Sequence, residues 1–148
     1  MSSLAVDIAA LLPHAGTARM IERVVRWDAQ TIVAATSRHR APDNPLRKDG
    51  RLAAVHLAEF GAQAMAIHGG LLTTAAGGTA RPALLVSVRD LSLAREFVDD
   101  LPGEIEITAR VLLATPANFQ YAFEVHHGGV QIASGRVAAM AYELPPRT

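Results

Sequence analysis

Three polar residues interrupt an apolar stretch of the sequence at a spacing typical of one helix face. Between Leu52 and Ile67 the only polar residues are His56, Glu59 and Gln63, at positions i, i+3 and i+7. A carboxyl group and an imidazole can exchange protons with a bound molecule, and an amide can orient both through hydrogen bonds. A stripe this narrow indicates a polar pocket, a subunit interface or a thin line of solvent contact.

The composition excludes several other kinds of chemistry. The chain of 148 residues has no cysteine, which excludes disulfides, thiolate metal sites and cysteine nucleophiles. No two histidines show the HxxxH spacing with a carboxylate, so we expect neither a bound metal nor a cofactor. Lys plus Arg equal Asp plus Glu at 14 each, and this balance favours neither nucleic acid nor an anionic membrane as a partner.

Length and hydropathy predict one globular domain over residues 1–148. Half of the residues are hydrophobic and 19% are charged, which argues against disorder. The longest apolar stretch, Leu52 to Leu72, contains His56, Glu59, Gln63 and His68 and is a poor membrane span. The first residues lack the basic segment and apolar core of a signal peptide, so we expect a cytoplasmic protein.

A long helix must position the three polar residues. The sequence from Leu52 to about Gly69 is rich in alanine and lacks proline, which favours a helix, and the Gly69-Gly70 pair is its expected end. A helix at the surface of a protein shows a broad polar face. This one is apolar on nearly every side, so we expect a sheet to curl around it.

The rest of the sequence predicts that sheet. Residues 20–27 and 31–36 form an expected hairpin around Asp28-Ala29-Gln30. A short helix at residues 4–12 precedes the hairpin, a polar loop at residues 38–50 follows it, and a linker of small residues is expected at 73–81. Four further strands are expected at Ala83–Arg89, Glu104–Leu113, Phe119–His126 and Val130–Tyr142. One helix between a hairpin and a run of antiparallel strands is an α+β plan.

Five segments of the chain resemble a known family in their order and spacing. They are Leu11–His14, Met20–Val24, Ala58–Gln63, Leu101–Glu104 and Ala133–Val137. Together they resemble the bacterial 3-hydroxyacyl-ACP dehydratases with the hotdog fold, in which a curved antiparallel sheet wraps a long central helix. Residues 43–46 and 62–69 are similar to a divergent branch of dehydratase-like proteins from polyene-pigment gene clusters.

The resemblance implies an activity and a role for two residues. Dehydration of a 3-hydroxyacyl thioester requires a base for the proton at C2 and an acid for the departing hydroxyl. In the family a loop histidine is the base, and a helix carboxyl across the dimer interface acts at the hydroxyl. Glu59 matches that carboxyl, and Gln63 matches the glutamine that follows it and is expected to orient Glu59 or the loop. We therefore predict a lyase of fatty-acid or polyene biosynthesis.

The loop before the helix departs from the family. Asn44 stands where the histidine is expected, and Asn44 cannot abstract a proton. With Asp43 beside it, Asn44 could hold a water or the thioester carbonyl. His56 could replace the missing base. His68 lies too far along the helix to share a reaction centre with Glu59, and we expect it to be structural.

Three functions follow from this departure. The first is a dehydratase whose base is His56 or a water held by Asp43 and Asn44. The second is a half-catalytic or non-catalytic subunit that complements a histidine-bearing hotdog partner. The third is a hotdog thioesterase, in which the helix carboxylate activates water or attacks the thioester.

The resemblance also implies partners. The substrate would be an acyl group on a carrier protein or on coenzyme A, and family members dimerise, so we expect a homodimer or a hetero-oligomer with another hotdog subunit. A carrier protein is acidic, which makes Arg38 and Arg40 docking candidates, with Arg47, Lys48 and Arg51 beside them. His39, between the first two arginines, is expected in a solvated loop.

Overall fold

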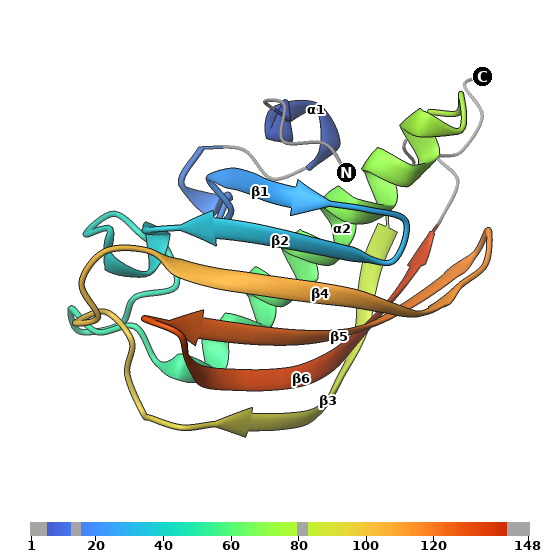
Figure 1. Cartoon of the computed structure of the whole chain (residues 1–148). Coiled ribbons are helices and arrows are strands. Elements are labelled where there is room, and N and C mark those ends of the chain that lie inside the picture. Colours follow the sequence, from blue (N-terminus) through green and yellow to red (C-terminus); the bar gives the residue numbers. More distant parts are fainter. Residues whose placement is uncertain (1–5, 13–15, 80–82, 142–148) are drawn as a thin grey trace, which may run out of the picture.

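A six-stranded antiparallel sheet curves around one long helix, α2 (Leu57–Ala75), as Figure 1 shows. The structure is a computed structural model and describes residues 6–12, 16–79 and 83–141. The order of strands in the sheet is β1-β2-β4-β5-β6-β3. The predicted α+β hotdog fold is therefore confirmed. The expected helix start at Leu4, the Pro13 stop, and the ends of the linker and last strand at Arg81 and Tyr142 lie outside the described residues.

The strands lie close to their predicted positions. Their bounds are β1 Arg23–Trp27, β2 Thr31–Thr36, β3 Ala83–Leu93, β4 Ile105–Ala114, β5 Asn118–His127 and β6 Val130–Ala141. The turn between β1 and β2 is closed by Asp28, whose carboxylate accepts hydrogen bonds from the main-chain N–H groups of Gln30 (2.8 Å) and Thr31 (2.9 Å). Gly128 and Gly129 join β5 to β6 with φ values of 57° and 80°, which only a glycine pair adopts readily.

Helix α2 begins at Leu57 rather than at the predicted Leu52. The preceding residues are extended and pair with a distant segment: the Ala54 N–H donates to the Glu96 carbonyl (2.7 Å), and the Leu52 carbonyl accepts from the Val98 N–H (3.0 Å). A 3₁₀ turn at Ala54–His56 then leads into the helix. The helix starts late because these long-range main-chain bonds take the place of helical ones.

The predicted end of the helix at Gly69-Gly70 is wrong, because α2 continues through both glycines to Ala75. The first residues of the expected linker at 73–81 are therefore helical. Two residues after the last helical residue, Ala75, Gly77 has a φ of 85°, and the N–H of Gly78 donates to the Thr73 carbonyl (2.9 Å). This is the usual glycine-terminated helix end, placed two turns later than the sequence suggested.

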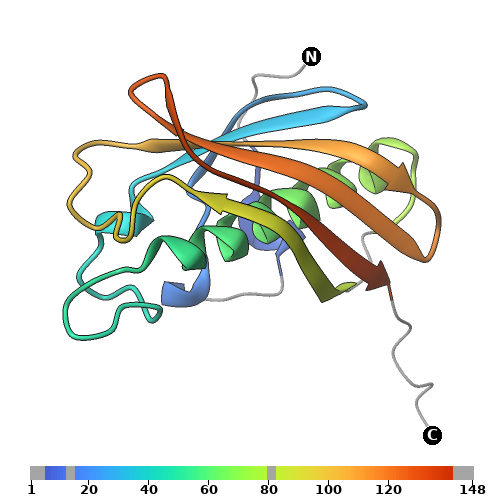
Figure 2. The same cartoon turned by 90° about the horizontal axis from the view of Figure 1, so that it is seen from below.

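The core lies between α2 and the concave face of the sheet, which arches over the helix in Figure 2. Alternate residues of β4 and β5, including Ile105, Ile107, Tyr121 and Phe123, point at the helix and are fully buried. The helix approaches the sheet closely at Gly61, where an added Cβ would lie 2.6 Å from the Phe123 ring. This helix–sheet packing fixes the azimuth of α2 and therefore the direction of its polar residues.

Strand β3 forms one edge of the sheet and exposes apolar side chains. Among the described residues it pairs with β6 alone, and Leu84, Val86 and Val88 are 63%, 50% and 40% exposed. An edge of this kind can accept a further strand. Within the part of the chain that the structure describes, no helix is long and apolar enough to cross a membrane.

Candidate active site

A cavity of about 770 Å³ lies along α2, and Glu59 is part of its wall. The helix contributes residues from its first turn, at Glu59, to its last turn, at Thr73. The opposite walls come from α1 (Ile8–Leu11), from β3, from the turn between β4 and β5, from the start of β5 and from the end of β6. Most of the wall is apolar, which suits a bound hydrocarbon better than a sugar or a nucleotide.

Gln63 holds Glu59 in place at this wall. The Gln63 amide donates to Oε2 of Glu59 (2.7 Å) and to the Ala18 carbonyl (3.0 Å), and its oxygen accepts from the Met20 N–H (2.7 Å). Gln63 is 1% exposed, whereas Glu59 is half-buried. The two residues that the sequence placed on one stripe are thus brought together. Their main-chain partners, Ala18 and Met20, had no sequence signal, because any residue supplies such groups.

Asn44 shapes the loop before the helix. Its side chain is 3% exposed, donates to the Arg38 carbonyl (2.8 Å) and accepts from the Leu46 N–H (2.9 Å). It also contacts the sulfur of Met20 at 3.3 Å. The N–H of Met20 in turn donates to Gln63, which holds the Glu59 carboxyl. Met20 therefore connects the loop at Asn44 to the site of Glu59. Direct contact between Asn44 and a substrate stays a prediction.

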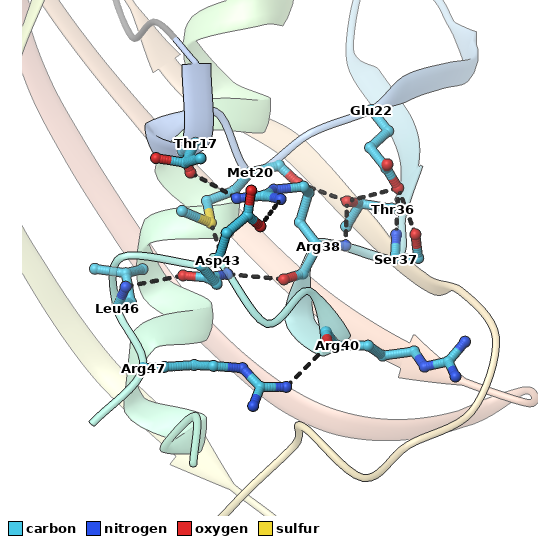
Figure 3. A network of polar contacts seen from close by, with 11 residues as sticks. Thr17, Met20, Glu22, Thr36, Ser37, Arg38, Arg40, Asp43, Leu46 and Arg47 are labelled. Atoms are coloured by element: carbon cyan, nitrogen blue, oxygen red, sulfur yellow. Dashed lines mark hydrogen bonds and ion pairs between the residues drawn. The ribbon is translucent and has the colours of Figure 1, made fainter. Parts of the chain in front are cut away.

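The charged residues of the same loop are largely engaged with each other, as Figure 3 shows. Arg38 forms an ion pair with Asp43 (2.8 Å) and donates to the Thr17 carbonyl (2.7 Å). The hydrogen bond from Arg38 holds the pKa of Asp43 below its usual value. Arg40 is exposed, and its guanidinium points away from this network. None of Arg38, Arg40, Asp43 and Asn44 lines the cavity.

A group missed by the sequence analysis anchors the start of that loop. The carboxylate of Glu22 accepts hydrogen bonds from the N–H and hydroxyl of Ser37, and the Thr36 hydroxyl donates to the Met20 carbonyl (2.6 Å). Glu22 lies in the segment predicted to be a strand, and an acidic residue in such a segment is expected to face solvent. Only its partners, fourteen and fifteen residues later, reveal its function.

The sequence matches a family of known proteins. Residues 6–145 match the ApeP-like family, described as ApeP dehydratase. The chain belongs to this family. Membership confirms that the protein is a dehydratase-like hotdog lyase of a divergent branch, which the motifs in the sequence predicted. No curated protein matches the chain significantly.

Solved structures share the fold of this ApeP-like dehydratase. The dehydratase heterocomplex ApeI:P from Xenorhabdus doucetiae is similar with a TM-score of 0.84 and 17% identity, over 93% of this chain and 92% of that one. An HP0420 homologue from Helicobacter felis has a TM-score of 0.65 and 9% identity, over 95% and 90%. A thioesterase from Haemophilus influenzae has a TM-score of 0.60 and 9% identity, over 82% and 78%. At these identities the likeness concerns the fold.

The histidines that the structure describes in this ApeP-like dehydratase stand apart from its cavity. None of the described residues that line the cavity is a histidine. His56 lies in the 3₁₀ turn before α2 and is not part of the cavity wall, so its role as a base stays a prediction. In the described parts of the chain, no cluster of three histidine, aspartate or glutamate residues could hold a metal ion.

The expectation that His39 lies in a solvated loop is wrong. His39 is fully buried, and its Nε2 lies 2.9 Å from the Leu101 carbonyl, to which it donates. Burial lowers its pKa below the usual value. The ring therefore fastens the loop to the segment before β4 and does not face solvent.

His68 is structural, as its distance from Glu59 suggested. Its ring is fully buried between the Tyr121 hydroxyl (2.6 Å) and the Asp28 carbonyl (2.7 Å). The rings of Trp27 and Tyr121 meet it edge-on, at centroid distances of 6.4 and 5.5 Å. Burial lowers the pKa of His68 and raises that of Tyr121. This cluster ties the β1–β2 turn and β5 to the middle of α2.

Proposed function

We propose that this protein supplies the carboxyl half of a composite dehydratase site and that a second hotdog subunit supplies the histidine. One observation carries the proposal: Glu59 lies in the wall of a large apolar cavity that receives no histidine from the described residues. The carboxyl is held by a buried amide, so its orientation is set before a substrate arrives. The described residues give this site an acid and no base, and a partner subunit would complete it.

The proposed reaction divides between the two subunits. The partner's histidine removes the proton at C2 of a 3-hydroxyacyl thioester, and the resulting electron pair forms the C2–C3 double bond. Glu59 donates its proton to the hydroxyl on C3, which leaves as water. The products are the enoyl thioester, water, a protonated histidine and a Glu59 carboxylate, and proton return through solvent restores both groups.

The edge of β3 is the proposed contact with that partner. Leu84 and Leu85 belong both to this exposed edge and to the cavity wall. A subunit that added its own strand to β3 would therefore lie directly beside the cavity. The heteromeric assembly of the structurally similar ApeI:P dehydratase supports a pairing of two different hotdog chains.

The exposed cations of the pre-helix loop are the proposed contact with the acyl carrier. Arg38 and Arg47 are engaged inside the loop, and Arg51 pairs with Asp99 (3.0 Å) and lies over the Phe97 ring. Arg40 and Lys48 are exposed. An acidic carrier protein in the cytoplasm would meet these two side chains first.

A reconstitution tests the proposal. We would co-express the chain with a histidine-bearing hotdog protein from the same gene neighbourhood and assay dehydration of 3-hydroxyacyl-ACP by each chain alone and by the complex. The complex should be active and each chain alone inactive. Full activity of this chain alone would overturn the composite site, and release of the free acid without enoyl product would indicate a thioesterase instead.

Two variants of the complex complete the test. Glu59→Gln should lower the dehydration rate by about 10²-fold or more, the usual contribution of a general acid. Glu106→Gln, a surface carboxyl on β4, is the matched control and should keep the wild-type rate. His56→Ala should leave the rate unchanged, and a loss comparable to that of Glu59→Gln would assign the base to this chain.

A further inference from the structure

Gly69 lies in the interior of α2, and the packing of the chain gives no reason for a glycine there. Glycine destabilises a helix interior relative to alanine. Gly61 in the same helix is required by packing, because an added Cβ would lie 2.6 Å from the Phe123 ring. At Gly69 an added Cβ would meet no atom within 4 Å, and the residue has ordinary helical geometry.

The space next to Gly69 belongs to the cavity that contains Glu59. Both residues line the same cavity, ten residues apart on one helix. With a rise of 1.5 Å per residue, Gly69 lies about 15 Å beyond Glu59, and the cavity continues for about 6 Å more to Thr73. The same cavity is also lined by Ala66, Ala139 and Ala141, which are small and apolar.

We propose that Gly69 determines how long an acyl chain the enzyme accepts, by leaving room for the distal part of the chain. The inference rests on the proposed function, because it takes Glu59 as the place of reaction. An extended carbon chain advances roughly 1.2 Å per bond, as an extended backbone does, so the 15 Å from Glu59 to Gly69 corresponds to about twelve bonds. Chains longer than this pass over Gly69, and shorter ones end before it.

The shape and chemistry of the cavity favour an acyl chain as the occupant. The space beside Gly69 and the carboxyl site belong to one cavity, and its wall is mostly apolar. The cavity extends along the helix from Glu59 to Thr73, a length that suits a long unbranched chain better than a compact ligand. A side chain of the partner subunit is the alternative occupant, and it would make Gly69 a requirement of assembly rather than of substrate choice.

Gly69→Leu tests the inference in the reconstituted complex. We would compare kcat/KM for 3-hydroxyacyl-ACP substrates of about eight and about sixteen carbons, which end before and beyond Gly69. The variant should lower kcat/KM for the long substrate by about tenfold or more, the range in which a filled apolar pocket discriminates, and should change the short substrate by less than about twofold. An equal loss for both substrates overturns the inference.

Two controls separate the possible causes. Thr74→Leu places the same side chain on the exposed side of α2, outside the cavity, and should leave the preference for chain length unchanged. Size-exclusion chromatography must show that Gly69→Leu still assembles with its partner. Loss of the complex would assign the space to the partner subunit and overturn the inference.

A binding measurement separates failure of this inference from failure of the proposed function. In a Glu59→Gln background, where turnover is slowed by about 10²-fold or more, calorimetry with acyl-pantetheine ligands of the two lengths should still show that Gly69→Leu weakens binding of the long ligand by about tenfold. If the wild-type complex is inactive but this loss appears, the chain site is right and the reaction assignment is wrong. If the complex is active and the loss is absent, the chain site is wrong.

Discussion

Gln63 is the residue whose replacement should report most directly on the site. Gln63→Met keeps the length of the side chain, its buried volume and its helix propensity, and it removes all three hydrogen bonds. The substitution therefore separates the polar contribution of the side chain from its packing.

The expected loss can be worked out bond by bond. The Met20 N–H is buried at a residue 1% exposed, and leaving it without an acceptor costs about 1–3 kcal/mol. The Ala18 carbonyl and the Glu59 carboxyl belong to half-buried residues that water can reach. Loss of the hydrogen bond from Gln63 to each of them therefore costs only about 0.5 kcal/mol. The free energy of unfolding should fall by about 2–4 kcal/mol, which leaves a domain of ordinary stability folded.

Urea unfolding followed by circular dichroism measures this loss. Gln131→Met, at an exposed position of β6, is the control and should stay within about 0.5 kcal/mol of the wild type. A Gln63→Met midpoint equal to that of the control would refute the hydrogen-bond network. In the reconstituted complex the same variant should lower kcat more than it raises KM, because Glu59 is no longer held in one orientation.

Three further predictions concern stability. Tyr121→Phe removes the hydroxyl that is hydrogen-bonded to Nδ1 of His68 and should lower the free energy of unfolding by about 1–3 kcal/mol in the same urea titration, again with Gln131→Met as the control. Burial lowers the pKa of His39 and of His68, so the unfolded chain takes up protons first as the pH falls below about 6.5. The free energy of unfolding should therefore fall as the pH is lowered from 7.5 to 5.5, by at most about 1.4 kcal/mol per pH unit for each histidine until the pKa of that histidine in the folded state is reached. Urea midpoints that stay unchanged over this range would contradict the burial of His39 and of His68. Asp43, Asp99 and Glu104 have lowered pKa values and lose their contributions only at more acidic pH. Gly61→Ala should destabilise by about 1–3 kcal/mol through the clash with Phe123, and Gly69→Ala should stabilise by about 0.5–1 kcal/mol; the reverse order in thermal unfolding would show that the helix sits differently on the sheet.

Local patterns in the sequence predicted the elements well where the decisive contacts are local. The hairpin turn at Asp28 is closed by bonds to residues two and three positions later, and the turn at Gly128-Gly129 needs only its own backbone conformation. The helix was recognised from its apolar composition. The pairing of Glu59 with Gln63 follows from helical spacing alone, since the residues lie one turn apart.

The errors arise where distant parts of the chain decide the structure. The start of α2 depends on bonds from residues 52 and 54 to residues 96–98, which no local pattern shows. The Gly69-Gly70 pair is a helix stop by propensity, but packing of neighbouring residues such as Ile67 and His68 carries the helix through it. His39 looked solvated because arginines flank it, yet its partner is the carbonyl of Leu101.

The open edge of β3 links the amount of this protein in a cell to the amount of its partner. An extended strand with exposed Leu84, Val86 and Val88 is a template on which other unfolded or extended chains can add. Copies made in excess of the partner would therefore self-associate or be removed by proteases. If one reaction centre is divided between two chains, as proposed, activity requires that both chains are synthesised in equal amounts. Selection then acts on the relative amounts of the two chains as well as on the residues that perform the reaction.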